Sequence, residues 1–167
     1  MFLKGKFCQL RSVTTHDLPL LLEWRNSEHV RVNMEHREII PPEEHAGWFR
    51  RITDNGYHYF MIESPELIPV GTIYLSGTTA DNGAESGLYI GDQRFLGTGI
   101  TIEASRLVIQ FAFEELRLDY LFAKIKEDNN DIIAYNKMLG FKEEKKISNG
   151  FLRMVLYKNK QVFENRL

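Results

Sequence analysis

The sequence predicts an α+β fold built on a mixed, mostly antiparallel, twisted sheet of about seven strands, with flanking helices and one parallel pair at its centre. Apolar residues recur with a period of two in some segments and at helical spacing in others. Three period-two segments lie between residues 57 and 90 and are joined by short turns, which favours an antiparallel meander. A long helical segment separates the last of them from the next strand, and such a crossover makes those two strands parallel.

The first third of the chain combines one strand with helices. Thr14 and Asp17 can cap the N-terminus of the first helix. Pro41 and Pro42 favour the start of another, because proline is tolerated in the first helical turn. We expect a strand over 7–13 and helices over 18–26, 30–34 and 42–52.

The rest of the chain alternates strands with two helices. Asn129 is a suitable N-cap for the second of these helices, and Gly140 fits the position just after its end. Asn149 and Gly150 indicate a tight hairpin between the last two strands. We expect strands over 57–63, 70–75, 84–90, 120–126, 141–146 and 151–157, and helices over 100–116 and 130–139.

Composition restricts the class of protein. The 167 residues carry 21 basic and 23 acidic side chains, a net charge of −2, with no run of five like charges, which argues against a nucleic-acid partner. No segment has the length and hydrophobicity of a signal peptide or a membrane span. Cys8 is the only cysteine, which excludes an intramolecular disulfide and a multi-cysteine metal site. We therefore expect residues 1–167 to form one cytoplasmic domain without a metal ion.

A strand that leads through a glycine-containing turn into a long helix is the most informative segment. Between the strand and the helix, Arg94-x-x-Gly97-x-Gly99 leaves two positions without a Cβ, where backbone N–H groups can surround an anion. The dipole of the following helix adds positive potential at the same point. The spacing matches neither a P-loop nor a dinucleotide-binding turn. We interpret it as a pyrophosphate site; the alternative is an ordinary turn in which the glycines only satisfy backbone geometry.

This turn resembles the acetyl-coenzyme A loop of the GNAT family of N-acetyltransferases, and the order of elements is similar as well. Asn129 followed by Leu139-Gly140-Phe141 resembles a second segment of the family. The resemblance covers most of the chain and implies the GNAT fold, in which the central parallel pair splays apart. It also implies acetyl-CoA as co-substrate, with the pyrophosphate held by the amides of the turn. The residues implied in acetyl-CoA binding are Leu88, Ile90, Arg94, Phe95, Leu96, Gly97, Thr98, Gly99, Asn129 and Asn136.

Direct attack of an amine on the thioester needs a base that takes the proton of the amine. Glu85 is the best candidate, because it lies on the central strand two residues before Gly87 and can face the splayed pair. The alternative is a solvated glutamate at a strand edge. His45 is the other possible base, and it is equally suited to hydrogen-bond the acceptor. Backbone N–H groups near residues 88–90 can stabilise the developing oxyanion.

The proton donor for the leaving thiolate departs from the family pattern. The tyrosine expected four residues before the glycine of Leu-Gly-Phe is replaced by Asn136, and Tyr135 stands one residue earlier. One residue corresponds to about 100° of helix, so Tyr135 does not simply inherit the role. Either a shifted helix start lets Tyr135 reach the sulfur, or Asn136 only binds the pantetheine and water protonates the thiolate. Tyr135 as a core residue is the third interpretation.

The N-terminal part of the chain carries a pattern of Trp24-Arg25-Asn26, then Met34, then Glu44-His45-x-x-Trp48-Phe49. This pattern resembles that of the amino-sugar N-acetyltransferases of the pseudaminic acid pathway. This resemblance implies a UDP-linked 4-amino-4,6-dideoxy sugar of the N-acetyl-altrosamine type as the acceptor. An aromatic ring can stack on the uracil or sugar, an arginine can pair with the diphosphate, and a methionine can line the 6-deoxy side. The residues expected to bind this acceptor are Trp24, Arg25, Arg31, Met34 and His45. The alternative is that the tryptophan and the methionine belong to the core of amphipathic helices.

Three other functions remain open on the sequence. Acetyltransferases of ribosomal-protein N-termini carry a related Trp-Arg segment and have a similar length. Polyamine acetylation is less favoured, because residues 25–37 carry three arginines against two glutamates. A non-catalytic acetyl-CoA-binding module is supported only by the asparagine at the tyrosine position. Family resemblance also implies a possible homodimer, which pairs through C-terminal strands.

Overall fold

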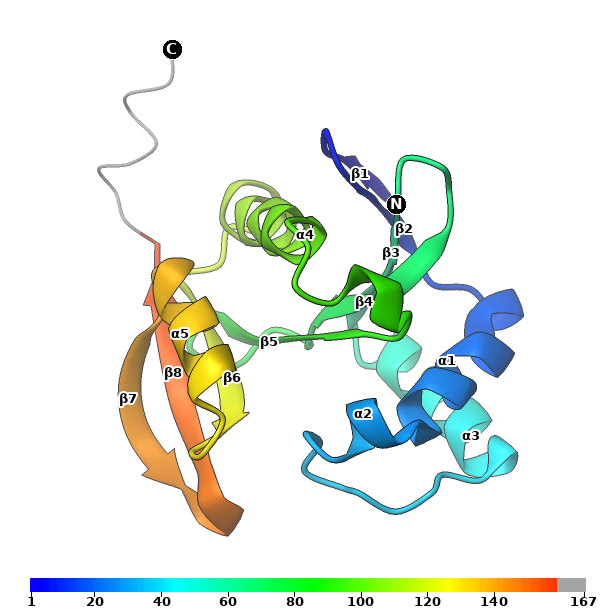
Figure 1. The fold of residues 1–167 in the computed structure, drawn as a ribbon. Coiled ribbons are helices and arrows are strands. Elements are labelled where there is room, and N and C mark those ends of the chain that lie inside the picture. Colours follow the sequence, from blue (N-terminus) through cyan, green and yellow to red (C-terminus); the bar gives the residue numbers. More distant parts are fainter. Residues whose placement is uncertain (159–167) are drawn as a thin grey trace.

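One eight-stranded sheet forms the centre of the protein in a computed structural model, which describes residues 1–158 (Figure 1). The strand order is β1-β2-β3-β4-β5-β6-β8-β7. The strands are β1 Phe2–Lys4, β2 Gln9–Ser12, β3 His58–Glu63, β4 Pro69–Leu75, β5 Gly83–Ile90, β6 Tyr120–Lys126, β7 Lys142–Ile147 and β8 Phe151–Tyr157. The predicted α+β class is confirmed, with β1 as one strand more than the sequence indicates.

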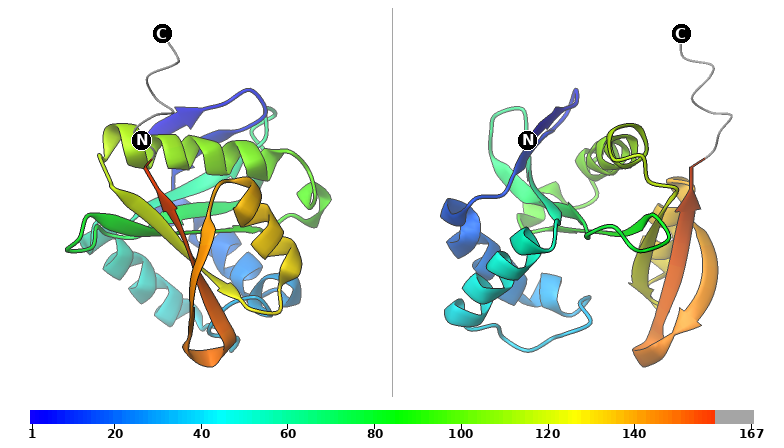
Figure 2. Two further views of the ribbon diagram at one scale, coloured as in Figure 1. Left: turned by 90° about the vertical axis from the view of Figure 1, so that its left-hand side faces the viewer. Right: turned by 180° about the vertical axis from the view of Figure 1, so that it is seen from behind.

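Helices cover both faces of this sheet (Figure 2). Within the described residues the α-helices are α1 Leu18–Asn26, α2 Glu28–Arg31, α3 Pro42–Asp54, α4 Ile100–Gln110 and α5 Asn130–Met138. Helices α1 to α3 lie on one face, and α4 and α5 on the other. A π-helical turn, Phe111–Glu115, extends α4 to the end that periodicity predicts.

The alternation of side chains along the strands divides the core between the two faces. On β3, Phe60 and Ile62 join the larger cluster, which contains Ala104 and Val108 of α4. Met61, between them, belongs to a smaller cluster with residues of α1. The face beneath α4 is therefore mainly aliphatic, whereas the face beneath α1 and α3 leaves room for polar and aromatic side chains.

The central pair, β5 and β6, is parallel and short. Its register runs only from Gly83, opposite Tyr120, to Glu85, opposite Phe122. Beyond that point β5 continues to Ile90 along β4, while β6 continues along β8. The two strands therefore separate, and one edge of β5 is left without a partner strand over its second half.

Several predicted element ends are confirmed. The Asn129 side chain accepts a hydrogen bond from Ile132 N (3.2 Å) at the start of α5. Gly140 follows the helix with a φ of +99°, a conformation that favours glycine. Asn149 and Gly150 have φ values of +62° and +76°, as a tight hairpin turn requires.

Two boundaries in the N-terminal part differ from expectation. Helix α2 spans Glu28–Arg31 rather than 30–34, because Ser27 is extended (φ −65°, ψ 146°) and starts the helix immediately after α1. The first predicted strand, 7–13, is confirmed only over Gln9–Ser12, since residues 5–8 form the turn that joins it to β1.

A carboxylate from α4 holds this β1–β2 turn. Glu103 accepts backbone hydrogen bonds from Lys6 N (2.8 Å), Phe7 N (2.6 Å) and Cys8 N (2.8 Å). Gly5 is required beside it, because a Cβ at that position would lie 2.5 Å from the carboxyl group. The hairpin is therefore anchored to the first turn of α4 by a residue nearly a hundred positions away.

None of the helices in residues 1–158 has the length and hydrophobicity that crossing a bilayer requires.

An ion-pair network ties β2 to the start of α1. The Arg11 guanidinium donates to both carboxylate oxygens of Asp17 (2.7 and 2.8 Å) and, through Nε, to Glu63 (2.7 Å). Thr14 N donates to the same Asp17 carboxylate (2.8 Å). The Arg11 guanidinium lowers the pKa of Asp17 below its ordinary value.

Asp17→Asn is expected to lower the free energy of unfolding by about 2 kcal/mol near neutral pH, because hydrogen bonds to an ionised group are lost. A carboxyl with a lowered folded pKa stabilises the protein above its unfolded pKa, near 3.9, and loses that contribution as the pH falls through the folded value. Urea unfolding near neutral pH and at about pH 3 should show the difference from wild type shrinking in acid. Asp54→Asn, at an exposed position of α3, is the control; a difference independent of pH would contradict the assignment.

Candidate functional site

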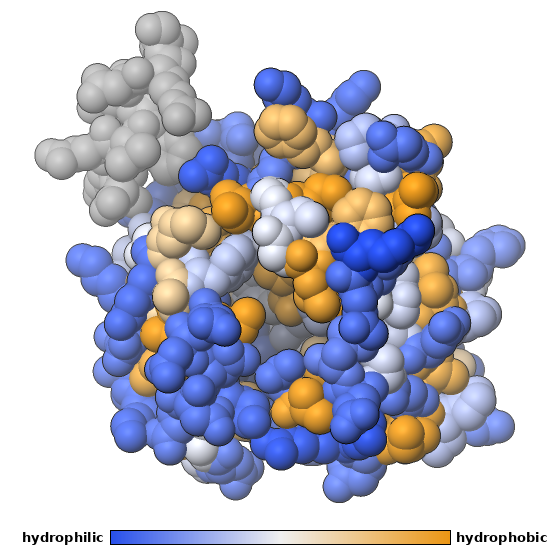
Figure 3. Space-filling model, viewed as in Figure 1, coloured by the Kyte–Doolittle hydropathy of each residue, from blue (hydrophilic) through white to orange (hydrophobic). Residues whose placement is uncertain are grey.

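The unpaired edge of β5 exposes backbone groups at a fixed spacing. Ser76 N donates to Glu85 O (2.8 Å), so Glu85 faces β4. Residues of a strand alternate in direction, and Leu88 and Ile90 therefore turn their N–H and C=O groups to the open side. This is where the sequence predicts them to bind an extended ligand. Figure 3 shows the surface hollowed near the centre of this view, in the region where β5 and β6 separate.

The glycine turn at the end of this edge is open. Gly97 has a φ of +71°, and a Cβ there would meet no atom within 4 Å. Gly99 is the N-cap of α4, also has free space, and provides no capping side chain. The first N–H groups of a helix have no intrahelical acceptor. The turn and the helix start therefore offer donors and a positive dipole end to an anion.

Arg94 lies beside the turn and is held by its neighbour Asp92. Its Nε donates to both oxygens of that carboxylate (3.0 and 3.1 Å), and its side chain is 74% exposed. Leu96 is exposed as well, and Thr98 donates through Oγ1 to Phe95 O (2.7 Å). The guanidinium can therefore reach an anion in solution at the cost of a weak, exposed ion pair.

Glu85 is the last residue of β5 that pairs with β6, and the two strands separate after it. Its Oε1 accepts a hydrogen bond from Tyr74 OH (3.0 Å), and Lys124 Nζ lies 3.1 Å from its Oε2. Tyr74 belongs to β4 and Lys124 to β6, so the carboxylate is contacted from both neighbouring strands. Burial, together with the Glu85 charge, raises the pKa of Tyr74 well above its ordinary value.

A series of aromatic rings in contact with one another lies between His45 and Glu85. His45 is 4% exposed and stacks on Trp48 (4.8 Å between centroids), which contacts Tyr59 edge-on (5.2 Å). Tyr59 then stacks on Tyr74 (5.3 Å, 3° between planes). Burial and the Arg25 charge lower the pKa of His45. The structure therefore does not bring the two predicted candidate bases together.

Tyr135 connects α5 to the first turns of α4. Its hydroxyl donates to Thr101 O (2.8 Å) and lies 2.8 Å from Ser105 Oγ. Burial raises the pKa of the phenol. The phenolic proton is thus committed to a backbone carbonyl of the helix that follows the glycine turn.

Asn129 and Asn136 lie at opposite ends of α5. The Asn129 amide donates to Asn33 Oδ1 (3.3 Å), which joins the start of α5 to the segment after α2. Asn136 is buried, and its amide donates to Ile132 O, one turn earlier in the same helix (2.9 Å).

Trp24 lies on the face of β5 opposite α4. It is 8% exposed and packs with Leu21 and Met61. Its ring covers Gly91, where a Cβ would lie only 1.9 Å from the indole. The chain after β5 therefore needs glycine at this position, and Trp24 serves the core while one side of it lines a cavity.

Arg25 extends from the same helix into the interior beneath α3. Nη2 donates to His36 O (2.6 Å), whereas Nη1 is buried and, in the described part of the chain, has no hydrogen-bond partner. Among the described residues, Thr72 Oγ1 is the other buried side-chain nitrogen or oxygen atom without a hydrogen-bond partner. Burial lowers the pKa of the guanidinium. A buried charge that lacks a counter-ion favours an anionic ligand.

The remaining predicted acceptor residues are Arg31, the last residue of α2, and Met34, in the segment between α2 and α3. Arg31 Nη1 donates to Arg37 O (3.2 Å) within this segment. Met34 is half-buried. Arg25 and Arg31 thus both hold backbone carbonyls of the segment that follows α2.

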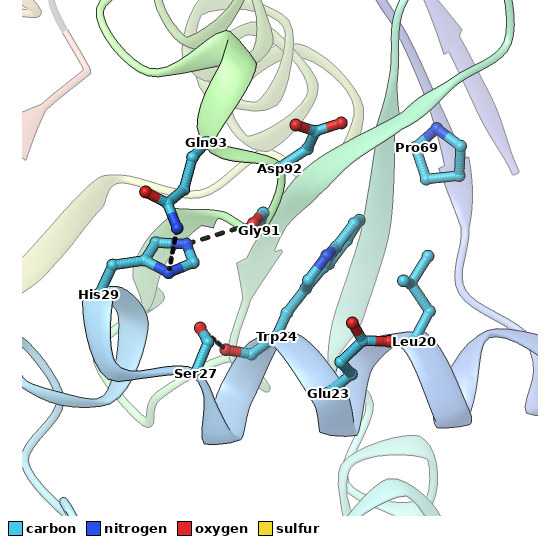
Figure 4. A pocket seen from close by; sticks show the side chains of 9 residues that line it. All are labelled: Leu20, Glu23, Trp24, Ser27, His29, Pro69, Gly91, Asp92 and Gln93. Carbon is cyan, nitrogen blue, oxygen red and sulfur yellow. Dashed lines mark hydrogen bonds between the residues drawn. The ribbon is translucent and has the colours of Figure 1, made fainter.

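A cavity of about 480 Å³ opens beside the end of β5 (Figure 4). It is lined by Leu20, Glu23, Trp24, Ser27, His29, Pro69, Gly91, Asp92 and Gln93. His29 Nε2 lies 3.3 Å from Ile90 O and 3.2 Å from Gly91 O, and Gln93 approaches its other ring nitrogen (3.4 Å). Helix α2 therefore contacts the free edge of β5 just before the glycine turn. Within residues 1–158, no cluster of three or more potential metal ligands occurs.

The sequence analysis did not identify four residues along β5: Tyr74 and Lys124 beside Glu85, and His29 and Gln93 at the end of the strand. Tyr74 and Lys124 were detectable in part, because both share the period-two face of Glu85 once the register of the strands is known. His29 and Gln93 carry no motif, and only the packing of α2 on β5 brings them to the site.

Three structural features lie along β5. The open glycine turn follows the C-terminal end of β5, an edge without a partner strand runs along the second half of β5, and the Glu85 carboxylate lies where the pairing with β6 ends. Glu85 and Ile90 are separated by about 16 Å of strand. This geometry suits an elongated ligand with a charged end, together with a second reactant that meets it near Glu85.

Comparison with known proteins agrees with this geometry. The model of the acetyltransferase (GNAT) domain family matches residues 8–142. An uncharacterized protein of Methanocaldococcus jannaschii is 28% identical over 140 residues, which are 82% of this chain; the chain spans only 28% of the length of that relative.

Solved structures share the fold at lower identity. A domain from Methanocaldococcus jannaschii has a TM-score of 0.83 and 24% identity, over 90% of this chain and 98% of that one. The spermidine N-acetyltransferase from Vibrio cholerae, in complex with CoA and spermine, has a TM-score of 0.80 and 19% identity, over 92% and 96%. A GNAT-family acetyltransferase from Bacillus anthracis has a TM-score of 0.79 and 17% identity, over 94% and 98%. With the family model matched over most of the chain, the protein belongs to the GNAT acetyltransferase family.

Proposed function

We propose that the protein is an acetyl-CoA-dependent N-acetyltransferase that acts on the amino group of a small molecule. The observation that carries this proposal is the free edge of β5, which runs from the Glu85 carboxylate to the open glycine turn. Family membership supports the same reaction class.

The residues present fit acetyl-CoA. The N–H groups from Arg94 to Gly99 and the start of α4 would hold the pyrophosphate, since both glycines leave the space that a Cβ would occupy. Leu88 and Ile90 would hydrogen-bond the pantetheine arm as a neighbouring strand would. When bound, acetyl-CoA supplies the acetyl group as an activated thioester.

Glu85 is the proposed base. The overall exchange forms an amide C–N bond and breaks the thioester C–S bond, and the proton lost by the amine nitrogen passes to Glu85, directly or through water. The leaving thiolate takes up a proton in turn. Tyr135 can supply it only by exchanging its hydrogen bond to Thr101 O, and otherwise water supplies it.

For the acceptor, we propose a nucleotide-linked amino sugar of the UDP-4-amino-4,6-dideoxy type. The half-buried Arg25, with Nη1 unpartnered within the described residues, favours an anionic group such as a diphosphate over a polycation. The similarity to spermidine N-acetyltransferases is a likeness of fold, and it makes a polyamine the first competing acceptor to test.

The cofactor site is tested by combining Arg94→Ala with Gly97→Val. The double variant loses a cation and forces a branched side chain into a positive-φ position, so acetyl-CoA affinity should fall at least about tenfold, or 1.4 kcal/mol. Isothermal titration calorimetry measures it. Arg50→Ala combined with Gly56→Val is the matched control, because Gly56 has the same φ of +71° and free space but lies after α3, outside the turn. Unchanged affinity in the double variant would refute the cofactor assignment.

The proton donor is tested by Tyr135→Phe. If Tyr135 protonates the thiolate, kcat should fall by about two orders of magnitude, the scale of general acid catalysis. If it only ties α5 to α4, melting temperature should fall while kcat stays near wild type. Loss of turnover in Asn136→Ala alone would transfer the role to the neighbouring position.

The acceptor is tested by a CoA release assay with a UDP-4-amino-4,6-dideoxy sugar, a ribosomal N-terminal peptide and spermidine. Turnover is expected on the sugar. Arg25→Gln should raise KM for the sugar at least about tenfold and leave KM for acetyl-CoA unchanged, because a charged hydrogen bond to the diphosphate is lost. Arg50→Gln, on the exposed side of α3, is the control. Turnover on spermidine or the peptide alone would overturn the amino-sugar proposal, and acetyl-CoA binding without any turnover would favour a non-catalytic module.

A further inference from the structure

We propose that Lys124, together with Tyr74, is a positioning residue that holds the Glu85 carboxylate at the closed end of the open β5 edge. The inference rests on the proposed function, in which Glu85 is the base. Neither residue belongs to a motif that the sequence singles out.

The register of the parallel pair explains how Lys124 reaches Glu85. Gly83 to Glu85 lie opposite Tyr120 to Phe122, and a continued register would place Lys124 opposite Gly87. The strands have separated at that point, and the lysine instead extends back to Glu85 Oε2 at 3.1 Å. The ion pair therefore bridges β5 and β6 just where their backbone pairing ends.

Tyr74 fixes the other oxygen of the carboxylate. Its hydroxyl donates to Oε1 at 3.0 Å from the opposite neighbouring strand. The ring lies nearly parallel to Tyr59 (3° between planes), and Tyr57 stacks on it at 6.2 Å. A Cβ at Gly87 would lie 2.6 Å from this ring, so the glycine leaves room for the tyrosine. Glu85 is thus oriented by two donors, one on each side.

We expect this ion pair to contribute little to folding stability. Lys124 and Glu85 have side-chain exposures of 38% and 22%, and ion pairs that reach solvent contribute little to stability. The position of β6 is fixed by its pairing with β8 along its whole length. Lys146 of β7 and Glu127, which follows β6, form another ion pair at 2.9 Å, which is far more exposed at 79% and 43%. What distinguishes the Lys124 pair is its place at the end of the parallel ladder.

The effect expected from this arrangement is on orientation. A base must lie within hydrogen-bond reach of the proton that it abstracts, and a carboxylate held by two donors occupies one direction rather than several. Removal of the lysine releases one oxygen and allows Glu85 to rotate toward solvent. Catalysis should suffer, while binding of acetyl-CoA at the glycine turn should not.

The test compares Lys124→Met, Lys124→Arg and Tyr74→Phe with wild type, using Lys146→Met as the matched control. We expect Lys124→Met to lower kcat about tenfold, with KM for both substrates within about twofold and melting temperature unchanged. Lys124→Arg, which keeps the donor and the charge, should recover most of kcat. Tyr74→Phe keeps the stacked ring and should lower kcat in the same way, whereas Lys146→Met should behave as wild type.

The outcomes separate this inference from the proposed function. Full kcat in Lys124→Met, or equal loss in Lys124→Met and Lys124→Arg, would overturn the positioning role while acetyl transfer stands. A lower melting temperature that accounts for the lost activity would overturn it as well. A wild-type protein that turns over none of the amines would refute the proposed function, and the positioning role with it.

Discussion

The short parallel pairing of β5 with β6 is the constraint on which the site depends. Three residue pairs are enough to hold the two halves of the sheet together, and their small number leaves the second half of β5 without a partner. Unpaired N–H and C=O groups at a sheet edge are available for another extended chain. If β5 paired with β6 over a greater length, the open edge of β5 would be covered. If the two strands did not pair at all, the position of the Glu85 carboxylate relative to β6 would not be fixed.

The two faces of β5 have different tasks. Leu88 packs on the mainly aliphatic cluster beneath α4, the helix that follows the glycine turn. The opposite face carries Glu85, the space at Gly87 and the ring of Tyr89, beneath the helices of the N-terminal half. Period-two alternation therefore gives β5 one face that supports the glycine turn and another that surrounds Glu85; in the proposed function, these serve the acyl donor and the amine.

Local signals predicted most of the fold and the open glycine turn between β5 and α4, because caps, turns and the Arg94-x-x-Gly97-x-Gly99 spacing are encoded in neighbouring residues. Strand β1 was missed because its turn is held by Glu103, far away in sequence. The link between Lys124 and Glu85 needed the register of the sheet. Burial of His45 on Trp48 likewise depends on how α3 packs, which periodicity alone does not give.

The contact between Glu103 and the β1–β2 turn has a consequence for protein engineering. The same helical turn that presents N–H groups at the glycine cradle also anchors the N-terminal hairpin through its carboxylate. Deletion of the hairpin would leave that negative charge without its three amide partners, in the helical turn that follows the glycine turn. A truncation that removes the hairpin is therefore expected to change the surroundings of the first turn of α4.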